Sequence, residues 1–289
     1  MFRIQRLTLG LLVIAAGALV GPAPASAQDV DVTRANYTVP VPPTQRILSF
    51  AGRVAPSNTT QSPTGFGASW GDVYIGASLV NRHRNAVIER GRDNMDGAFG
   101  LGLGLGNARD LLGLEIGVIS YSTANGPFKR GGINAKLHRS FGRDWGIAVG
   151  SQNALSWGDA VDQVRSFYGA ISHVWREPQF LPLRSLTANI GVGNGYFDYE
   201  SKLEPTDETD FGVFASIAIQ PVDRASFILD WAGQDLNFGA SAVPFAGVPL
   251  VFNGALLDIL NRADQTEGIR VMASVGYGLR IRSLGFLVP

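Results

Sequence analysis

The chain has no cysteine, three histidines and three methionines in 289 residues, and no excess of either charge. Without cysteine, it offers neither a disulfide framework nor a thiolate metal site. With so few histidines, we expect no metal site and no cofactor. The 24 basic residues balance the 24 acidic ones, whereas nucleic-acid binding requires a concentrated basic surface. The composition therefore argues against a nucleic-acid partner.

Long apolar runs are missing after residue 27, so the sequence predicts no membrane helix beyond that point. The run from Leu7 to Val20 follows Arg3 and Arg6 and is succeeded by Ala25-Ser26-Ala27. This order is typical of a secretory signal peptide, residues 1–27, with cleavage near Gln28. An N-terminal membrane anchor is the alternative.

Glycine is abundant, at 36 residues, and charged residues are few, at 17%. An exported chain of this kind is either a soluble β-sandwich or an outer-membrane β-barrel. Residues 28–66 contain five prolines among polar residues, which indicates an extended periplasmic leader or a plug. We expect the barrel itself to comprise residues 67–289.

Hydrophobic periodicity favours the barrel. Ten segments alternate with a period of two over about ten residues each, the length of a tilted membrane strand. Their apolar positions fall within 73–79, 99–105, 112–118, 133–141, 145–149, 167–175, 186–192, 211–219, 225–231 and 269–281. The opposite positions are mostly Gly, Ala, Ser and Asn, as a crowded barrel interior requires. The sequence thus predicts an all-β, antiparallel up-and-down barrel with its apolar face toward lipid.

The links between segments nearly alternate between short and long, which matches short periplasmic turns and long external loops. Residues 176–184 are the exception, a long link where a short turn is expected. Residues 239–267 decide the strand number. Pro244 and Pro249 interrupt them, and 254–260 resembles a short helix. We therefore predict a long loop and about ten strands, with twelve as the alternative.

Four segments resemble uncharacterised outer-membrane barrels of cyanobacteria and other Gram-negative bacteria. They are Ser69-Trp70-Gly71-Asp72, Tyr168-Gly169, Gly191 to Gly195, and Asp230 to Asn237. The stretch Gln234 to Asn237 also resembles barrels linked to exopolysaccharide export. The resemblance covers about residues 65–282 and implies the fold and an outer-membrane location. It carries no catalytic residue across.

Polar side chains on the inner face are the candidate site, because they would line a lumen and set its selectivity. They are Asp72, Glu115, Asn134, Lys136, His138, Asp230, Arg270, Arg280 and Arg282. Glu115 should pair with Lys136 across a hairpin, and Asp72 should meet Arg280 and Arg282 at the barrel seam. Charge pairing in a narrow interior needs no transport role, so these residues also fit a closed barrel.

The glycine run 100–106 has a period of two and therefore lies in a strand rather than a phosphate-binding loop. It predicts a thin wall beside free space in the lumen. Water, the leader 28–66, or the loop 239–267 would fill that space. The alternative is that glycine serves the curvature of a small barrel.

Catalysis would rest on His138 with Ser140, which share the inner face of one segment. No nucleophile elbow is visible, and an inward His is more often a hydrogen-bonding wall residue. We therefore expect no enzyme, with an outer-membrane hydrolase as a distant alternative.

The expected partners are outer-membrane lipid and lipopolysaccharide, the barrel-insertion machinery and polar solutes. The basic loop 81–95 and the acidic loop 199–210 would face the exterior. Two functions remain open from the sequence: a porin-like or export-associated channel for polar solutes, and a closed structural or surface-binding barrel.

Overall fold

The computed structural model describes residues 55–81, 95–121, 128–158, 165–179, 181–198, 211–262 and 268–280. The predicted signal peptide, leader residues 28–54, most of the basic loop, the acidic loop 199–210 and Arg282 lie outside these residues. Within the described residues, no helix is long and apolar enough to cross a membrane.

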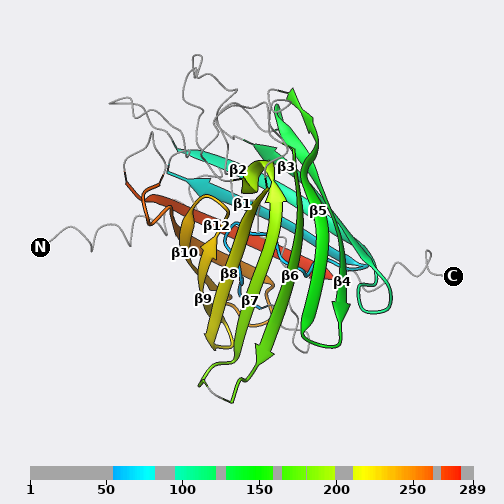
Figure 1. The fold of residues 1–289 in the computed structure, drawn as a ribbon, viewed down its shortest axis with the longest axis vertical. Helices are drawn as coiled ribbons and strands as arrows, with labels where there is room; N and C mark the ends of the chain where they lie inside the picture. Colours follow the sequence, from blue (N-terminus) through cyan, green and yellow to red (C-terminus); the bar gives the residue numbers. More distant parts are fainter. Residues whose placement is uncertain are drawn as a thin grey trace, which may run out of the picture.

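Twelve antiparallel strands form one closed barrel in which each strand pairs with its neighbours in the sequence (Figure 1). Strand β1 also pairs with β12, which closes the sheet. The strands are β1 (Asp72–Val80), β2 (Asp96–Gly106), β3 (Gly113–Tyr121), β4 (Gly131–Phe141), β5 (Trp145–Trp157), β6 (Ser166–Arg176), β7 (Ser185–Asn194), β8 (Phe211–Val222), β9 (Ala225–Trp231), β10 (Leu236–Ala242), β11 (Leu250–Leu257) and β12 (Arg270–Arg280). The predicted antiparallel up-and-down barrel is confirmed, and closure excludes a sandwich.

The strand number is twelve, the larger of the two expected values, and the preference for ten is corrected. Residues 239–267 are not a long loop, because they contribute the end of β10 and all of β11. Pro244 and Pro249 flank the turn between these strands rather than interrupt them, and a proline in that position removes no ladder hydrogen bond. Most of the segment expected as a helix, 254–260, is the end of β11.

The links of an up-and-down barrel lie alternately at its two ends. Links 107–112, 142–144, 177–184, 223–224 and 243–249 share one end, which we call the short-turn end. The long-loop end has the links 81–95, 122–130, 158–165, 195–210 and 258–269, together with the tight link 232–235. The 177–184 link therefore lies at the end where a short turn is expected.

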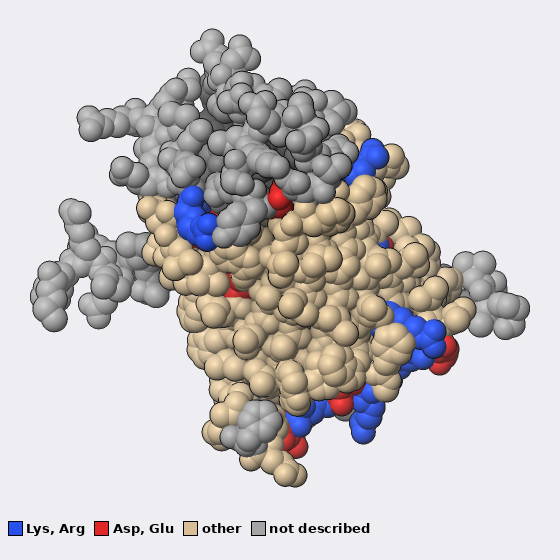
Figure 2. Space-filling model, in the orientation of Figure 1, with Lys and Arg blue, Asp and Glu red and all other residues tan. Residues whose placement is uncertain are grey.

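Apolar side chains cover the outside of the barrel. Exposed large apolar residues occur on eleven of the twelve strands, and they include Ile75, Leu101, Leu137, Val149, Ile171, Ile190, Ile217, Leu229, Phe238, Phe252 and Leu279. On the face in Figure 2, uncharged side chains dominate the middle, and most of the Lys, Arg, Asp and Glu side chains lie toward the upper and lower margins. A soluble monomer does not expose an apolar surface of this extent, whereas an outer-membrane barrel has such a belt.

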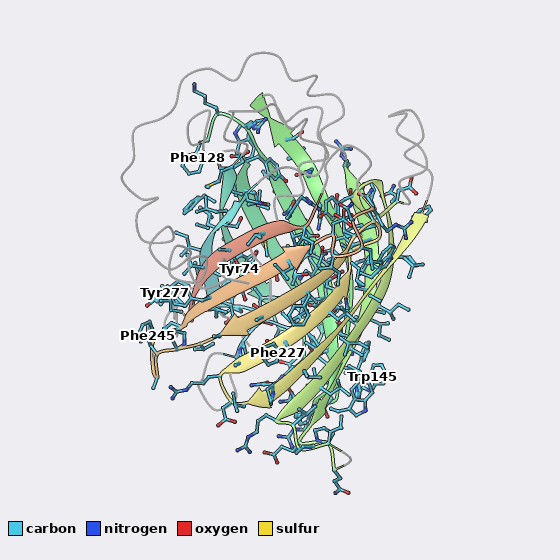
Figure 3. All side chains as sticks on the ribbon, turned by 90° about the vertical axis from the view of Figure 1, so that its left-hand side faces the viewer. Tyr74, Phe128, Trp145, Phe227, Phe245 and Tyr277 are labelled. Atoms are coloured by element: carbon cyan, nitrogen blue, oxygen red, sulfur yellow. The ribbon has the colours of Figure 1, made fainter. Side chains whose placement is uncertain are left out.

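Aromatic residues mark the short-turn end of this belt. The Trp145 and His173 rings are tilted against each other with centroids 4.1 Å apart, and His173 contacts Trp175 edge-on at 4.3 Å. Figure 3 shows Trp145 on the outside of the barrel. His173 thus interrupts the apolar positions of β6 as a member of an aromatic cluster, and outer-membrane barrels carry aromatic girdles of this kind.

Candidate functional site

The lumen contains a segment of the chain itself. Residues 55–69, which we call the plug segment, precede β1 and are buried except for Ala55 and Asn58, which are partly buried. Ser57 lies against Ser226 and Ser241, near the short-turn ends of β9 and β10. The chain then reaches Asp230 and Asn237, near the long-loop ends of the same strands, and returns to the start of β1. The segment thus enters and leaves the lumen at the short-turn end.

Asp230 on β9 is the main anchor of the plug segment. Its Oδ2 accepts hydrogen bonds from the backbone N–H groups of Thr60 (2.7 Å), Gln61 (2.9 Å) and Ser62 (3.1 Å). The Thr60 hydroxyl also donates to Oδ2 at 2.9 Å, and the Ser62 hydroxyl donates to Oδ1. Successive N–H groups that converge in this way form a pocket for an anion. The carboxylate of Asp230 therefore fixes the turn of the plug segment.

A second group of anchors lies on β3 and β4. Glu115 Oε2 accepts a hydrogen bond from the Ala68 N–H at 2.7 Å, and Lys136 Nζ donates to the Phe66 carbonyl at 2.9 Å. Nε2 of His138 lies 2.8 Å from the Ala68 carbonyl oxygen. Glu115 and Lys136 also form the predicted pair, 3.6 Å apart and registered across the two strands. Tyr74 donates to the other Glu115 oxygen at 3.1 Å.

Between these two groups, β6 and β7 hold the middle of the plug segment. Asn189 donates from Nδ2 to the Pro63 carbonyl at 2.9 Å, and the Gly65 N–H donates to Ser172 Oγ at 2.8 Å. Asn237 on β10 donates to the Gln61 side-chain oxygen at 2.9 Å. Opposite walls of the barrel therefore bind successive residues of one chain segment.

Glycines of the wall make room for the plug segment. A Cβ at Gly146 would lie 2.5 Å from the Phe66 ring, and one at Gly104 would lie 2.4 Å from the Ala68 backbone. A Cβ at Gly239 would meet the Thr60 methyl group at 2.4 Å. Gly102 lies instead against the ring of Tyr74. The space predicted beside the glycine-rich wall is thus filled by the plug segment, which extends three residues beyond the predicted leader, and by one tyrosine.

A small cavity remains beside the plug segment. It has a volume of about 30 Å³ and is lined by residues 59–64 and by polar groups of β3, β4 and β5, including Glu115, Asn134 and Lys136. A space of this size holds one or two water molecules. With the plug segment in place, this pocket therefore suits water better than a larger solute.

The remaining predicted lumen residues lie in three different parts of the barrel. Asn134 accepts a hydrogen bond from the Asn153 N–H at 2.9 Å. Arg270 is buried and pairs with Asp235. Asp72 accepts a hydrogen bond from the Ser69 N–H and is the registered neighbour of Arg280 across the β1–β12 seam. The seam prediction holds for the strand register, with β12 in place of a tenth strand.

Sequence reasoning missed several contacts of the plug segment and two buried charge pairs of the barrel. Ser172 and Ser226 lie at inward positions of predicted strands, but a serine there gives no signal that separates an anchor from ordinary wall. Ser241 falls in the range predicted as a loop, and Asp235 lies in the tight link before β10. The pair of Arg130 with Asp96, 3.7 Å apart and buried, joins the start of β2 to the start of β4.

The candidate catalytic pair has a different arrangement from an activated nucleophile. His138 and Ser140 both lie inward on β4 and are buried, and Nε2 of His138 is directed to the plug segment. Ser140 Oγ has no hydrogen-bond partner among the described residues. Among those residues, no group of three His, Cys, Asp or Glu side chains is arranged to hold a metal ion.

Comparisons with known proteins found similarity among solved structures but none among family models or curated proteins. No family model matches the chain, and no curated protein matches it. Among solved structures, the chain is similar to the outer membrane phospholipase A from Escherichia coli, at 11% sequence identity and a TM-score of 0.36. The match covers 73% of this chain and 93% of that one. A likeness at this level carries no argument about activity.

Proposed function

We propose that the protein is an outer-membrane channel for small polar solutes that is closed at rest by its own plug segment and opens when the segment leaves the lumen. The observation that carries this proposal is the chemistry of the plug contacts. Three wall groups bind the plug segment through hydrogen bonds, and Phe66 is its single large apolar side chain. Three of the charges predicted to line a channel, Glu115, Lys136 and Asp230, thus bind a segment of the chain that precedes the first strand.

Polar contacts suit a segment that has to move. A hydrogen bond inside a protein contributes only about 0.5–1.5 kcal/mol net, because water replaces it when it breaks. Withdrawing an apolar core into water costs far more, at about 25 cal/mol for each Å² exposed. A permanent filling would favour apolar side chains from the wall itself, whereas here wall glycines leave space for another segment.

The outer-membrane location is part of the proposal, and the apolar belt on eleven of the twelve strands supports it. We also propose that the barrel is not an enzyme, since Nε2 of His138 serves the plug segment. The partners that follow are outer-membrane lipid on the belt, the barrel-insertion machinery during assembly, and polar solutes in the open lumen.

A closed structural barrel is the second candidate, and one observation favours it. Phe197, from the short helix η3 (Gly195–Phe197), is fully buried with Phe214 and Tyr168. The Phe197 ring lies 4.7 Å from Phe214 and 5.8 Å from Tyr168. This apolar cluster occupies the side of the lumen formed by β6, β7 and β8. Because its side chains are apolar and come from the barrel itself, the cluster fills that side permanently.

Single-channel conductance in planar bilayers separates the two functions. Gly146→Ala places a methyl group 2.5 Å from the Phe66 ring and 2.8 Å from the Gly65 carbonyl oxygen, so the plug segment must shift. Overpacking of this kind costs about 1–3 kcal/mol, which would raise the open fraction roughly 5- to 150-fold. Gly276→Ala is the matched control, because its Cβ would meet nothing within 4 Å.

The gated channel predicts rare openings for the wild type and Gly276→Ala, and frequent openings for Gly146→Ala. Silence from all three proteins would contradict the channel and favour the structural barrel. Steady current of equal size from all three would contradict the plug.

A further inference from the structure

Three buried pairs of opposite charge in the barrel balance internally. Glu115 pairs with Lys136, Asp96 with Arg130, and Asp235 with Arg270. Each of these pairs lies within the wall, so each remains neutral as a unit whether or not the plug segment is present. A wall built only from such pairs would give an open lumen little preference for either sign of ion.

Asp230 forms no such pair among the residues that the structure describes. Its hydrogen-bond partners among the described residues are the backbone and hydroxyl groups of residues 60–62, and none is a cation. Its registered neighbours on the adjoining strands are Ser216 and Asn237, which are uncharged. The charge of Asp230 is therefore compensated by the N–H dipoles of the plug segment instead of by the wall.

Removal of the plug segment changes this balance. The N–H groups of Thr60, Gln61 and Ser62 leave together, since they belong to one continuous stretch. A carboxylate then faces the open lumen without a neighbouring positive charge. Fixed carboxylates in a pore attract cations and repel anions, particularly where low-dielectric walls focus the field.

We propose that the open lumen selects cations and that Asp230 sets this preference. This inference rests on the proposed gated channel and names its solute class, small polar cations. The same carboxylate then has two states: in the closed barrel it binds the plug segment, and in the open barrel it binds the permeating cation. A cation and the plug segment consequently compete for one site.

The test measures the permeability ratio of K⁺ to Cl⁻ from reversal potentials in a KCl gradient. All proteins carry Gly146→Ala, so that openings are frequent enough to measure. Asp230→Asn removes the charge with little change of size, and Asp230→Glu keeps the charge while shifting its position. Asp223→Asn is the control, because it removes an equal charge from an exposed turn at the short-turn end.

We expect a ratio well above one for the Gly146→Ala background, for Asp230→Glu and for Asp223→Asn, and a several-fold lower ratio for Asp230→Asn. An anion-selective background would overturn the inference, and so would a ratio that Asp230→Asn leaves unchanged. Currents would still be present in both cases, so the gated channel would survive. Absence of current from every variant would overturn the channel and the inference with it.

Discussion

Asp230→Asn should release the plug segment. Four donors converge on Oδ2 of Asp230 at 2.7–3.1 Å, which the negative charge permits. A hydrogen bond to a charged group contributes about 1.5–3 kcal/mol, against about 0.5–1.5 kcal/mol for a neutral one. The four bonds at Oδ2 together therefore lose a few kcal/mol when a neutral amide oxygen replaces the carboxylate oxygen, at about 1 kcal/mol each.

Part of this loss is offset, because removing a neutral amide from water costs less free energy than removing a carboxylate. A net change of about 2 kcal/mol remains, and since 1.4 kcal/mol corresponds to a factor of ten, the open fraction should rise roughly 30-fold. The direction depends on the number of donors at one oxygen, which the structure gives directly.

Thiol labelling measures the open fraction without a conductance assay. The chain has no cysteine, so Thr64→Cys introduces a single thiol reporter in the plug segment. Thr64 suits this purpose because it is buried and its hydroxyl donates to the Phe66 carbonyl of the same segment, not to the barrel wall. The rate of reaction with a polar maleimide should follow the open fraction. Asp223→Asn with the same reporter controls for loss of a charge.

We expect labelling about 30-fold faster in Asp230→Asn than in the parent, and no change in Asp223→Asn. An equal or slower rate in Asp230→Asn would refute the assignment of Asp230 as the main anchor. Gel mobility before and after heating should show a folded barrel in each variant.

Two further predictions concern the wall. Lys136→Met should lower the free energy of unfolding by about 3–5 kcal/mol, because it leaves the buried Glu115 without its cation, and adding Glu115→Gln should restore part of the loss in urea unfolding from lipid vesicles. Ile190→Lys, at a position on β7 that is 53% exposed, should destabilise the barrel by up to about 2–4 kcal/mol if that face meets lipid; a neutral effect in the same assay would contradict membrane insertion.

Much of the barrel could be predicted from the sequence, because a wall between lipid and a polar lumen imposes a period of two on every strand. β1 to β9 and β12 follow that pattern closely. β10 and β11 were missed because Pro244 and Pro249 resemble strand breaks when their register is unknown, and a short apolar run such as 254–260 fits either a helix or a strand. Only the pairing of strands in the closed sheet determines that residues 254–257 form a strand and not a helix.

The candidate site was predictable in part. Alternation placed Glu115, Lys136, His138 and Asp230 inside, and it paired Glu115 with Lys136. The conformation of the plug segment could not be predicted, because residues 55–69 have no periodicity of their own and take their shape from hydrogen bonds to distant strands. Contacts such as Thr60 with Asp230 join residues 170 positions apart, and no local sequence signal reports them.

The central claim is that residues 55–69 close the lumen, and a disulfide lock tests it most directly. The Ser57 N–H donates to Ser241 Oγ at 2.8 Å, which keeps the Cα atoms of the two residues within the range that a disulfide spans, so Ser57→Cys with Ser241→Cys is the pair to oxidise. The Gly146→Ala background supplies frequent openings. We predict that oxidation forms the cross-link and suppresses the current, and that a reductant restores the current. Failure of the cross-link to form, or full current through the oxidised protein, would contradict the account.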